Sequence, residues 1–175
     1  DYATGTPGTT GLSRCASSFP HDGNTLILDG GDILQGSPFA YWLSREPVEG
    51  AKVSAQVMNL AGYHFVTIGN HDFNFGRETL ESYLSHLGAR CVSANVEGVS
   101  GVERTAVVTL ENGLRVGITG VTTHFVNLWE KPENLVGIKV HEAFLAAAAA
   151  LEELKQAGVD ITAVSYTHLR AHETV

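Results

Sequence analysis

Two short segments of the sequence place metal-binding side chains beside glycines. Residues 29–32 read Asp-Gly-Gly-Asp and directly follow the apolar run 26–28. Residues 69–72 read Gly-Asn-His-Asp and directly follow the largely apolar run 65–68. Carboxylate, amide and imidazole groups bind divalent cations, and glycines let a backbone approach an ion without an intervening Cβ atom. Because a carboxylate at the end of a buried strand loses its hydration, a bound metal ion is the first candidate for what compensates that cost.

The segments around these residues alternate between strand-like and helix-like patterns. Strands are predicted at 25–29, 64–69, 90–96 and 159–165, and helices at 37–44, 50–62, 77–88 and 141–158. The pair Asn112-Gly113 lies between two apolar runs and predicts a β-hairpin at 105–121. Strand–helix–strand units together with a hairpin predict an α/β domain with a mixed sheet. Since ligands in open α/β sheets gather at the carboxyl ends of strands, the two polar segments are expected to meet there.

The predicted helices carry boundary and face signals. Ser37 is suited to cap a helix that begins at Pro38, and Gly62 and Gly88 are suited to end the next two helices. The apolar faces are predicted to be Val53, Val57 and Leu60 in the helix at 50–62, and Leu80, Leu84 and Leu87 in the helix at 77–88.

The composition limits the partners that the chain is expected to bind. It has 175 residues and a formal net charge of −8, so it lacks the basic surplus that binds nucleic-acid polymers non-specifically. An anionic substrate would need its charge met locally, most simply by bound cations. No apolar run approaches the roughly 20 residues of a membrane span. Cys15 and Cys91 could pair only if the fold brought them together, and both are expected to be small core residues.

Four separated segments carry a resemblance to a known family. "GDILQGSP" at 31–38 and "GNHDFNFG" at 69–76 resemble the Gly-Asp and Gly-Asn-His-Asp/Glu blocks of the calcineurin-type metallophosphoesterase superfamily. The Gln-Gly-Ser-Pro ending and "SANV" at 93–96 resemble its 5'-nucleotidase branch. "VTTHFVNLWEKPENLVGIKV" at 121–140 resembles the subgroup that acts on 2',3'-cyclic nucleotides, where a Trp-Glu-x-Pro segment follows the hairpin. The resemblance runs from about Gly11 to Ser165.

This resemblance implies a fold, an activity and a bimetallic site. The fold would be a four-layer α/β/β/α sandwich, and the activity would be hydrolysis of 2',3'-cyclic nucleotides, 5'-nucleotides or both, by hydroxide attack on phosphorus. Two divalent ions are implied, with Mn²⁺, Zn²⁺ and Co²⁺ all compatible with mixed N and O ligands. Asp32 would bridge the ions, and Asn70 would bind the second ion and contact a phosphoryl oxygen. His71 would stabilise the transition state or protonate the leaving oxygen without binding metal.

Further residues are expected to support this site. In the nucleotidase branch a carboxylate three residues after the histidine orients it, whereas this chain has Asn74. Asp72 and Gln35 are candidate supporting residues, and Asn95 either positions the site or ends a strand. Asp29 is expected to cap the neighbouring turn rather than bind metal. Two alternatives stay open: His124 as a site residue, and Trp129 as a stacking surface for a base or as a buried anchor of its loop.

Parts of the family's pattern are absent from these residues. The Asp-x-His and Gly-His-x-His blocks do not occur, and we expect truncation rather than loss. The Ser-His-x-Gly block is expected after residue 164, where the sequence reads "SYTHLRAHETV" instead. His168, and with it His172, is therefore a weak candidate metal ligand, and 166–175 are expected to be a non-native tail. The chain at 1–165 is then a partial catalytic domain that we expect to be inactive alone.

A second class of function remains open from the sequence. The chain could be a binding or scaffold domain that retains the fold without metals, a reading that Asn74 favours and the set Asp32, Asn70 and His71 disfavours. The resemblance suggests a periplasmic or extracellular location and a small phosphoester as partner. The oligomeric state does not follow from the sequence.

Overall fold

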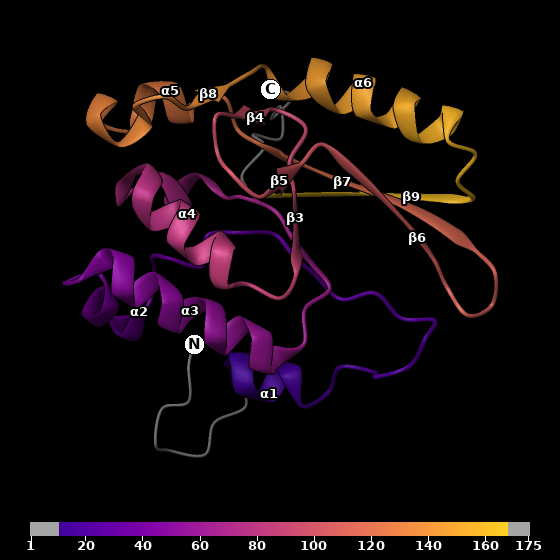
Figure 1. Cartoon of the computed structure of the whole chain (residues 1–175), viewed down its shortest axis with the longest axis horizontal. Helices are drawn as coiled ribbons and strands as arrows, with labels where there is room; N and C mark the ends of the chain where they lie inside the picture. The colour runs from indigo at the N-terminus through magenta and orange to yellow at the C-terminus, as the bar shows by residue number, and fades with distance from the viewer. Residues whose placement is uncertain (1–10, 168–175) are drawn as a thin grey trace, which may run out of the picture.

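The computed structural model describes residues 11–167 and contains two main sheets (Figure 1). The first sheet is fully parallel, in the order β1-β2-β3-β5. Its strands are β1 (Leu28–Asp29), β2 (Phe65–Val66), β3 (Arg90–Val92) and β5 (Val102–Glu103). Because parallel strands end at the same edge of a sheet, the residues that follow β1 and β2 are brought side by side.

The second sheet is mixed, in the order β6-β7-β9. Its strands are β6 (Thr105–Thr109), β7 (Arg115–Thr122) and β9 (Ile161–Thr167). β6 and β7 form the predicted antiparallel hairpin, in which Gly113 has φ +89°, and β9 pairs in parallel with β7 from Val116–Ile161 to Thr122–Thr167. A small ribbon joins β4 (Val96–Glu97) to β8 (Lys139–Val140).

Helices cover the outer faces of both sheets. The α-helices are α1 (Leu12–Ala16), α2 (Pro38–Leu43), α3 (Pro47–Ala61), α4 (Gly76–His86), α5 (Val126–Trp129) and α6 (Ala143–Gln156), and the 3₁₀ turns are η1 (Asn70–Phe73) and η2 (Pro132–Leu135). In Figure 1, α3 and α4 lie side by side on one side of the molecule and α6 lies on the other. The order of layers is therefore helix, sheet, sheet, helix, which is the predicted α/β/β/α fold.

Alternation along the strands separates two hydrophobic cores. In β2, Val66 packs into the core under α3 and α4, while Phe65 packs into the core between the sheets. In β3, Cys91 and Val92 divide in the same way. Successive side chains of a strand point to opposite faces, so a sheet covered on both faces needs continuous apolar runs. This is the physical reason why these strands read as unbroken hydrophobic segments in the sequence.

The predicted boundaries at Ser37 and Gly62 are confirmed, whereas α4 ends at His86, two residues before the predicted stop at Gly88, and one predicted face is wrong. Ser37 caps α2 by accepting from the N–H of Ala40 at 3.0 Å, and α3 ends at Gly62 with φ +80°. In α4, Leu80 is buried, with Leu84 and Leu87 packed beside the core.

The error concerns the buried face of α3. Val53 and Leu60 are exposed, and Leu60 is 90% exposed. The buried face instead comprises Gly50, Ala51, Ser54, Ala55, Met58 and Ala61. Small residues are needed there because a Cβ atom on Gly50 would lie 2.4 Å from the carbonyl oxygen of Leu43. Close packing therefore overrides the hydrophobic pattern.

The two cysteines are unpaired and lie in different environments. Cys91 is buried in β3 as predicted, whereas Cys15 in α1 is exposed, so the prediction of a core residue is wrong there. Burial raises the pKa of the Cys91 thiol to about 12, because the thiolate would lose its hydration. Within residues 11–167, no helix is long and apolar enough to cross a membrane.

The cysteine environments predict selective alkylation. In the native protein, iodoacetamide should label Cys15 at neutral pH and leave Cys91 unmodified, because only an exposed thiolate reacts readily. Mass spectrometry should find one label per chain, and two after unfolding in guanidinium chloride. A Cys15→Ser variant should take no label until it unfolds. Rapid native labelling of that variant would contradict the burial of β3.

Candidate functional site

The loops after β1 and β2 touch each other through two glycines. Gly31 has φ +91°, and a Cβ atom built on it would lie 2.2 Å from the backbone nitrogen of Gly69. A Cβ atom on Gly69 would lie 2.2 Å from Oδ1 of Asp32. Any larger residue at either position would therefore separate the two loops. From the sequence, we predicted that these glycines let the backbone approach an ion. In the structure, they let one loop approach the other.

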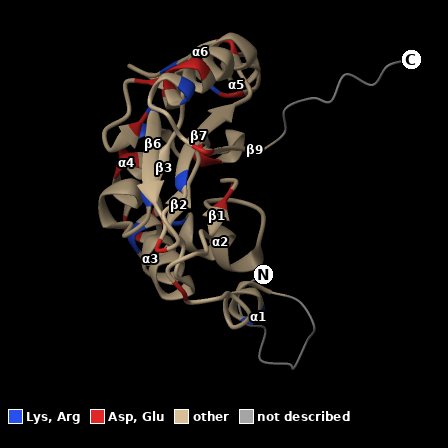
Figure 2. Ribbon diagram, turned by 90° about the vertical axis from the view of Figure 1, so that its right-hand side faces the viewer, with Lys and Arg blue, Asp and Glu red and all other residues tan. Residues whose placement is uncertain are grey.

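Asp29 has the structural role that was predicted for it. Its Oδ1 accepts from the N–H of Gly31 at 2.9 Å, which closes the turn after β1. Burial raises its pKa, and the hydrogen bond from Gly31 opposes that rise. The backbone carbonyl of Asp29 also accepts from Oγ of Ser165, so the end of β1 lies beside β9 (Figure 2).

Asp72 binds the two loops together from inside. Its carboxylate accepts from the N–H groups of Gly69 at 2.8 Å, Asp32 at 2.9 Å, Ile33 at 2.9 Å and Leu34 at 3.1 Å. The side chain is only 2% exposed. Loss of hydration raises the pKa of Asp72 to about 6, against the lowering effect of these N–H donors, and the nearby Asp32 carboxylate adds to the rise. The sequence analysis gave Asp72 only as a candidate supporting residue, because three of its four partners lie 38 to 40 residues earlier in the chain.

Asp32 lies directly against the second loop. It has φ +64°, a left-handed conformation that is uncommon for a residue with a side chain and is tolerated best by Asn and Asp. Its Oδ1 accepts from the N–H of His71 at 2.8 Å. The structure thus brings Asp32, Asn70 and His71 together at the ends of β1 and β2.

Asn70 carries an unsatisfied polar atom. Its Oδ1 is buried and, among the residues that the structure describes, has no hydrogen-bond partner. Leaving a buried acceptor unpaired costs roughly 1–3 kcal/mol. An amide oxygen and a carboxylate are both ligands that divalent cations accept, so the chemistry of Asn70 and Asp32 fits a metal ion. Within the described part of the chain, however, no group of three or more His, Cys, Asp or Glu side chains could hold a metal.

His71 is exposed and borders two amide side chains. Its Nδ1 lies 3.5 Å from the amide nitrogen of Asn74. That amide nitrogen lies 2.8 Å from Oε1 of Gln35. His71, Asn74 and Gln35 thus form one polar group beside Asp32. At position 74 the amide occupies the place where the family resemblance led us to expect a carboxylate.

Asn95 connects the second sheet to the site. It is 1% exposed, and its amide donates to the carbonyls of Thr122 at 2.6 Å and His141 at 2.9 Å while accepting from the N–H of Thr122 at 2.9 Å. The hydroxyl of Thr122 donates to the carbonyl of Ile68, immediately before Gly69 and Asn70. Of the two alternatives, the contacts favour a positioning role. Thr122 was missed because nothing in the sequence reveals this long-range contact.

Two of the remaining candidates, His124 and Trp129, contact the ring of Phe125, and two others lie outside the described residues. His124 stacks on Phe125 with ring centroids 4.6 Å apart. Trp129 also stacks on Phe125, with ring centroids 5.7 Å apart. Trp129 is 55% exposed, so it is not a buried anchor. His168 and His172 lie outside the described residues, although β9 continues through Tyr166 and Thr167.

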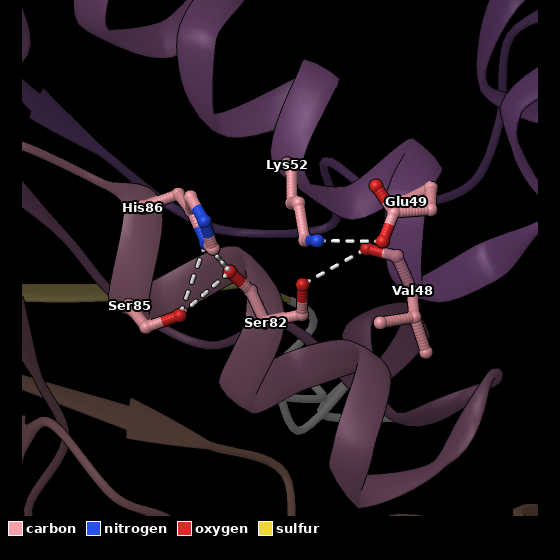
Figure 3. Close-up of polar contacts among 6 residues, drawn as sticks. All are labelled: Val48, Glu49, Lys52, Ser82, Ser85 and His86. Atoms are coloured by element: carbon pink, nitrogen blue, oxygen red, sulfur yellow. Dashed lines mark hydrogen bonds and ion pairs between the residues drawn. The ribbon is translucent and has the colours of Figure 1, made fainter.

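A Ser-His-x-Gly sequence does occur elsewhere, at 85–88, but it serves helix packing. Figure 3 shows His86 at the end of α4, with Nδ1 2.8 Å from the carbonyl of Ser82 and 3.1 Å from Oγ of Ser85. Ser82 in turn donates to the carbonyl of Val48 at the start of α3 (Figure 3). This histidine therefore ends α4 and does not reach the cluster around Asp32.

Glu130 and Asn134, which the sequence analysis did not select as site residues, border the site. Asn134 donates to the backbone carbonyl of Asn74 at 2.8 Å and to Oε1 of Glu130 at 2.9 Å. Both belong to the Trp-Glu-x-Pro segment and the turn that follows it. The motif was visible in the sequence, but its spatial neighbour was not.

The four hydrogen bonds that the Asp72 carboxylate accepts predict that Asp72→Asn lowers stability by an amount that depends on pH. The asparagine amide has one acceptor oxygen, and its NH₂ group would face backbone N–H groups that now donate to the carboxylate. The variant should therefore lose about 3 kcal/mol of unfolding free energy. The raised pKa means that the folded protein holds this proton more tightly, so the stabilising effect of the carboxyl is full below about pH 4 and is lost as the pH rises through about 6.

The cost of Asp72→Asn should therefore be larger near pH 5 than near pH 7. Urea unfolding in a metal chelator at both pH values measures it, with Asp160→Asn as the matched control on an exposed carboxylate. A cost that grows with pH would show that the N–H donors outweigh desolvation.

Comparisons with known proteins agree with the geometry. No protein-family model matches the chain. An alignment 156 positions long, which covers 79% of this chain, is 30% identical to the trifunctional nucleotide phosphoesterase protein YfkN of Bacillus subtilis (strain 168), of which it covers 11%. A second alignment, 156 positions long, is 26% identical to the 2',3'-cyclic-nucleotide 2'-phosphodiesterase/3'-nucleotidase of Salmonella typhimurium. This alignment covers 81% of this chain and 24% of that protein.

A solved structure shares the fold. The crystal structure of calcineurin-like phosphoesterase YfkN from Bacillus subtilis aligns with a TM-score of 0.69 and 26% identity, over 83% of this chain and 48% of that one. The chain thus spans less than half the length of each of these proteins. By sequence and by fold, the chain belongs to the calcineurin-like phosphoesterases, in the group that includes 5'-nucleotidases and 2',3'-cyclic-nucleotide phosphodiesterases.

Proposed function

We propose that the chain is part of the catalytic domain of a metal-dependent hydrolase of nucleotide phosphoesters. Its substrates would be 2',3'-cyclic nucleotides, 5'-nucleotides or both. The observation that carries the proposal is the unpaired, buried Oδ1 of Asn70 at the same sheet edge as the carboxylate of Asp32. The names of the relatives, which are nucleotide phosphoesterases, support this substrate class.

Asp32 and Asn70 are the residues that would hold metal. A carboxylate can bridge two ions and an amide oxygen can complete the shell of one, and Mn²⁺, Zn²⁺ and Co²⁺ accept such oxygen ligands. His168 remains a weak candidate for a further ligand. Bound ions would neutralise the ester and lower the pKa of a water molecule. They would also explain how a chain with a net charge of −8 binds an anion.

The side chains around the metal ligands divide the remaining work. Asn70 would also donate from its amide nitrogen to a phosphoryl oxygen. His71 is exposed next to Asp32, so its ring can reach a leaving oxygen and give it a proton as the P–O bond breaks and water's oxygen joins phosphorus. Asp72, Asn95 and Thr122 hold the backbone that carries these groups. Gln35 and Asn74 would orient His71.

Metal binding is the first measurable consequence. Adding Mn²⁺ to the chain should raise its melting temperature by several degrees, because an ion that binds only the folded state stabilises it. Asp32→Asn should abolish most of this rise, since it removes the bridging charge. Asp160→Asn, at the far end of the second sheet, should keep it. A chain that shows no response to Mn²⁺, Zn²⁺ or Co²⁺ would favour a binding or scaffold domain without metals.

Activity is expected only with the complete set of ligands. The coding DNA on both sides of these residues should encode Asp-x-His upstream, and Ser-His-x-Gly and Gly-His-x-His downstream. The protein with those blocks should hydrolyse 2',3'-cyclic AMP or 5'-AMP in Mn²⁺, and His71→Ala should lower kcat by about 100-fold or more. The 175 residues alone should be inactive. A stop codon directly after Val175 would contradict the hydrolase proposal.

Two related expectations are part of the same proposal. A small phosphoester is the expected partner, with no binding of nucleic-acid polymers, because the net charge of −8 offers no basic surplus. A periplasmic or extracellular location is proposed from the family resemblance alone.

A further inference from the structure

The side-chain amide of Asn74 lies between the neutral amide of Gln35 and the carboxylate of Glu130. Its orientation decides whether its nitrogen or its oxygen faces the ring of His71. In one orientation the amide nitrogen donates to Oε1 of Gln35 at 2.8 Å and lies 3.5 Å from Nδ1 of His71. In the reverse orientation that nitrogen donates to Oε2 of Glu130 at 3.0 Å and to the carbonyl of His71 at 3.2 Å. The amide oxygen then occupies the position beside Nδ1 of His71, at 2.8 Å from Oε1 and 3.3 Å from Nε2 of Gln35.

Charge selects the second orientation. If the amide oxygen faced Glu130, two acceptor oxygens would lie 3.0 Å apart with no proton between them, and one of them would belong to a carboxylate. With the nitrogen facing Glu130, the same distance becomes a charge-assisted hydrogen bond, which is roughly twice as strong as a neutral one. The second orientation places the Asn74 oxygen 2.8 Å from Oε1 of Gln35, so the Gln35 amide must also rotate to present its nitrogen there. Because that amide is neutral and can donate or accept, its rotation removes this conflict, whereas a carboxylate such as Glu130 has no donor to offer.

Glu130 is itself held in place. Its Oε1 accepts from the N–H of Lys131 at 2.8 Å and from the amide of Asn134 at 2.9 Å. Asn134 also donates to the backbone carbonyl of Asn74 at 2.8 Å. One carboxylate oxygen of Glu130 is therefore committed to its own loop, while the other is aimed at the Asn74 amide. The Trp-Glu-x-Pro segment and η1 are joined through these contacts.

We propose that Glu130 is a positioning residue that acts on His71 through the amide of Asn74. By holding the amide nitrogen, Glu130 turns the amide oxygen toward Nδ1 of His71, so that Nδ1 carries the proton of the neutral ring. Nε2 then has no proton in the neutral ring, so His71 can give a proton from Nε2 only as the imidazolium, whose Nδ1–H keeps the same acceptor. The role of this tautomer in ester hydrolysis rests on the proposed function, whereas the orientation itself does not.

This arrangement gives a physical reason for the pair Asn74 and Glu130. A carboxylate at position 74 would accept directly from Nδ1 of His71, but it would face Glu130 across 3.0 Å. Two carboxylates at that distance repel each other because both are negatively charged. An amide at position 74 removes the repulsion and passes the orienting effect of Glu130 to the histidine ring.

The first test reads the tautomer of His71 directly. Long-range ¹H–¹⁵N correlation spectra of the chain, recorded in a metal chelator at about pH 9 where imidazoles are neutral, distinguish the protonated ring nitrogen from the bare one. His71→Ala identifies the signals among the eight histidines. The Nδ1–H form should dominate in the native protein, and Glu130→Ala should shift the population toward Nε2–H.

A matched variant separates orientation from simple loss of charge. Glu133→Ala removes an exposed carboxylate from the same loop and should leave the His71 spectrum unchanged. Equal spectra for Glu130→Ala and the native protein, or equal changes in both variants, would overturn the inference.

The second test measures the coupling between positions 74 and 130 by thermal unfolding in the chelator. Asn74→Asp should lower the melting temperature by about 3 °C or more, because the new carboxylate faces Glu130. Adding Glu130→Gln should restore most of that loss, whereas adding Glu133→Gln should restore none. Equal losses from Asn74→Asp in all three backgrounds would refute the pairing.

Neither test involves a substrate or a metal ion. A chain that shows the tautomer shift and the rescue but no phosphoesterase activity in its complete form would leave the role of Glu130 standing and refute the proposed function. A complete, active enzyme whose His71 tautomer does not respond to Glu130→Ala would do the opposite.

Discussion

The site depends on one buried carboxylate more than on any other group. Asp72 accepts from four backbone N–H groups, three on the loop after β1 and one on the loop after β2. Loops that leave adjacent parallel strands carry unpaired N–H groups, and a carboxylate is the side chain that can satisfy several at once. Without it, the left-handed turn at Asp32 would lose the contacts that hold it, and the proposed metal ligands would separate.

The two sheets contribute to this arrangement from opposite sides. The first sheet supplies the loops, and the second supplies the support through Thr122, whose hydroxyl bonds the carbonyl of Ile68, and through Asn95, which holds Thr122. Ser165 on β9 likewise bonds the carbonyl of Asp29. The ends of β1 and β2 are thus braced by β7 and β9. A position at the meeting edge of two packed sheets gives small side chains a rigid frame, which a metal site requires.

Sequence patterns predicted the elements better than their packing. The hairpin around Asn112-Gly113 and the cap at Ser37 follow from local backbone chemistry, which the sequence contains directly. The buried face of α3 was wrong because close contact with Leu43 selects small residues, and that contact exists only in the folded chain. The clustering of Asp32, Asn70 and His71 followed from the rule that parallel strands end together.

What the sequence missed in the site has a common cause. The partners of Asp72 lie 38 to 40 residues away along the chain, apart from the N–H of Gly69, and Asn95 meets Thr122 across 27 residues. Glu130 reaches Asn74 from a separate loop. No local pattern encodes such pairings, so polar residues with ordinary neighbours can have decisive roles. The motifs predict which residues take part in the chemistry, while the structure shows which residues hold them in place.

The backbone of η1 explains how one short segment performs several tasks. A 3₁₀ turn has three residues per turn, so successive side chains point about 120° apart. In η1, Asn70 directs its oxygen inward, His71 is exposed, Asp72 is buried against the first loop and Phe73 is buried in the core. The proposed metal ligand Asn70, the proposed proton donor His71 and the structural carboxylate Asp72 thus point in different directions from three consecutive residues.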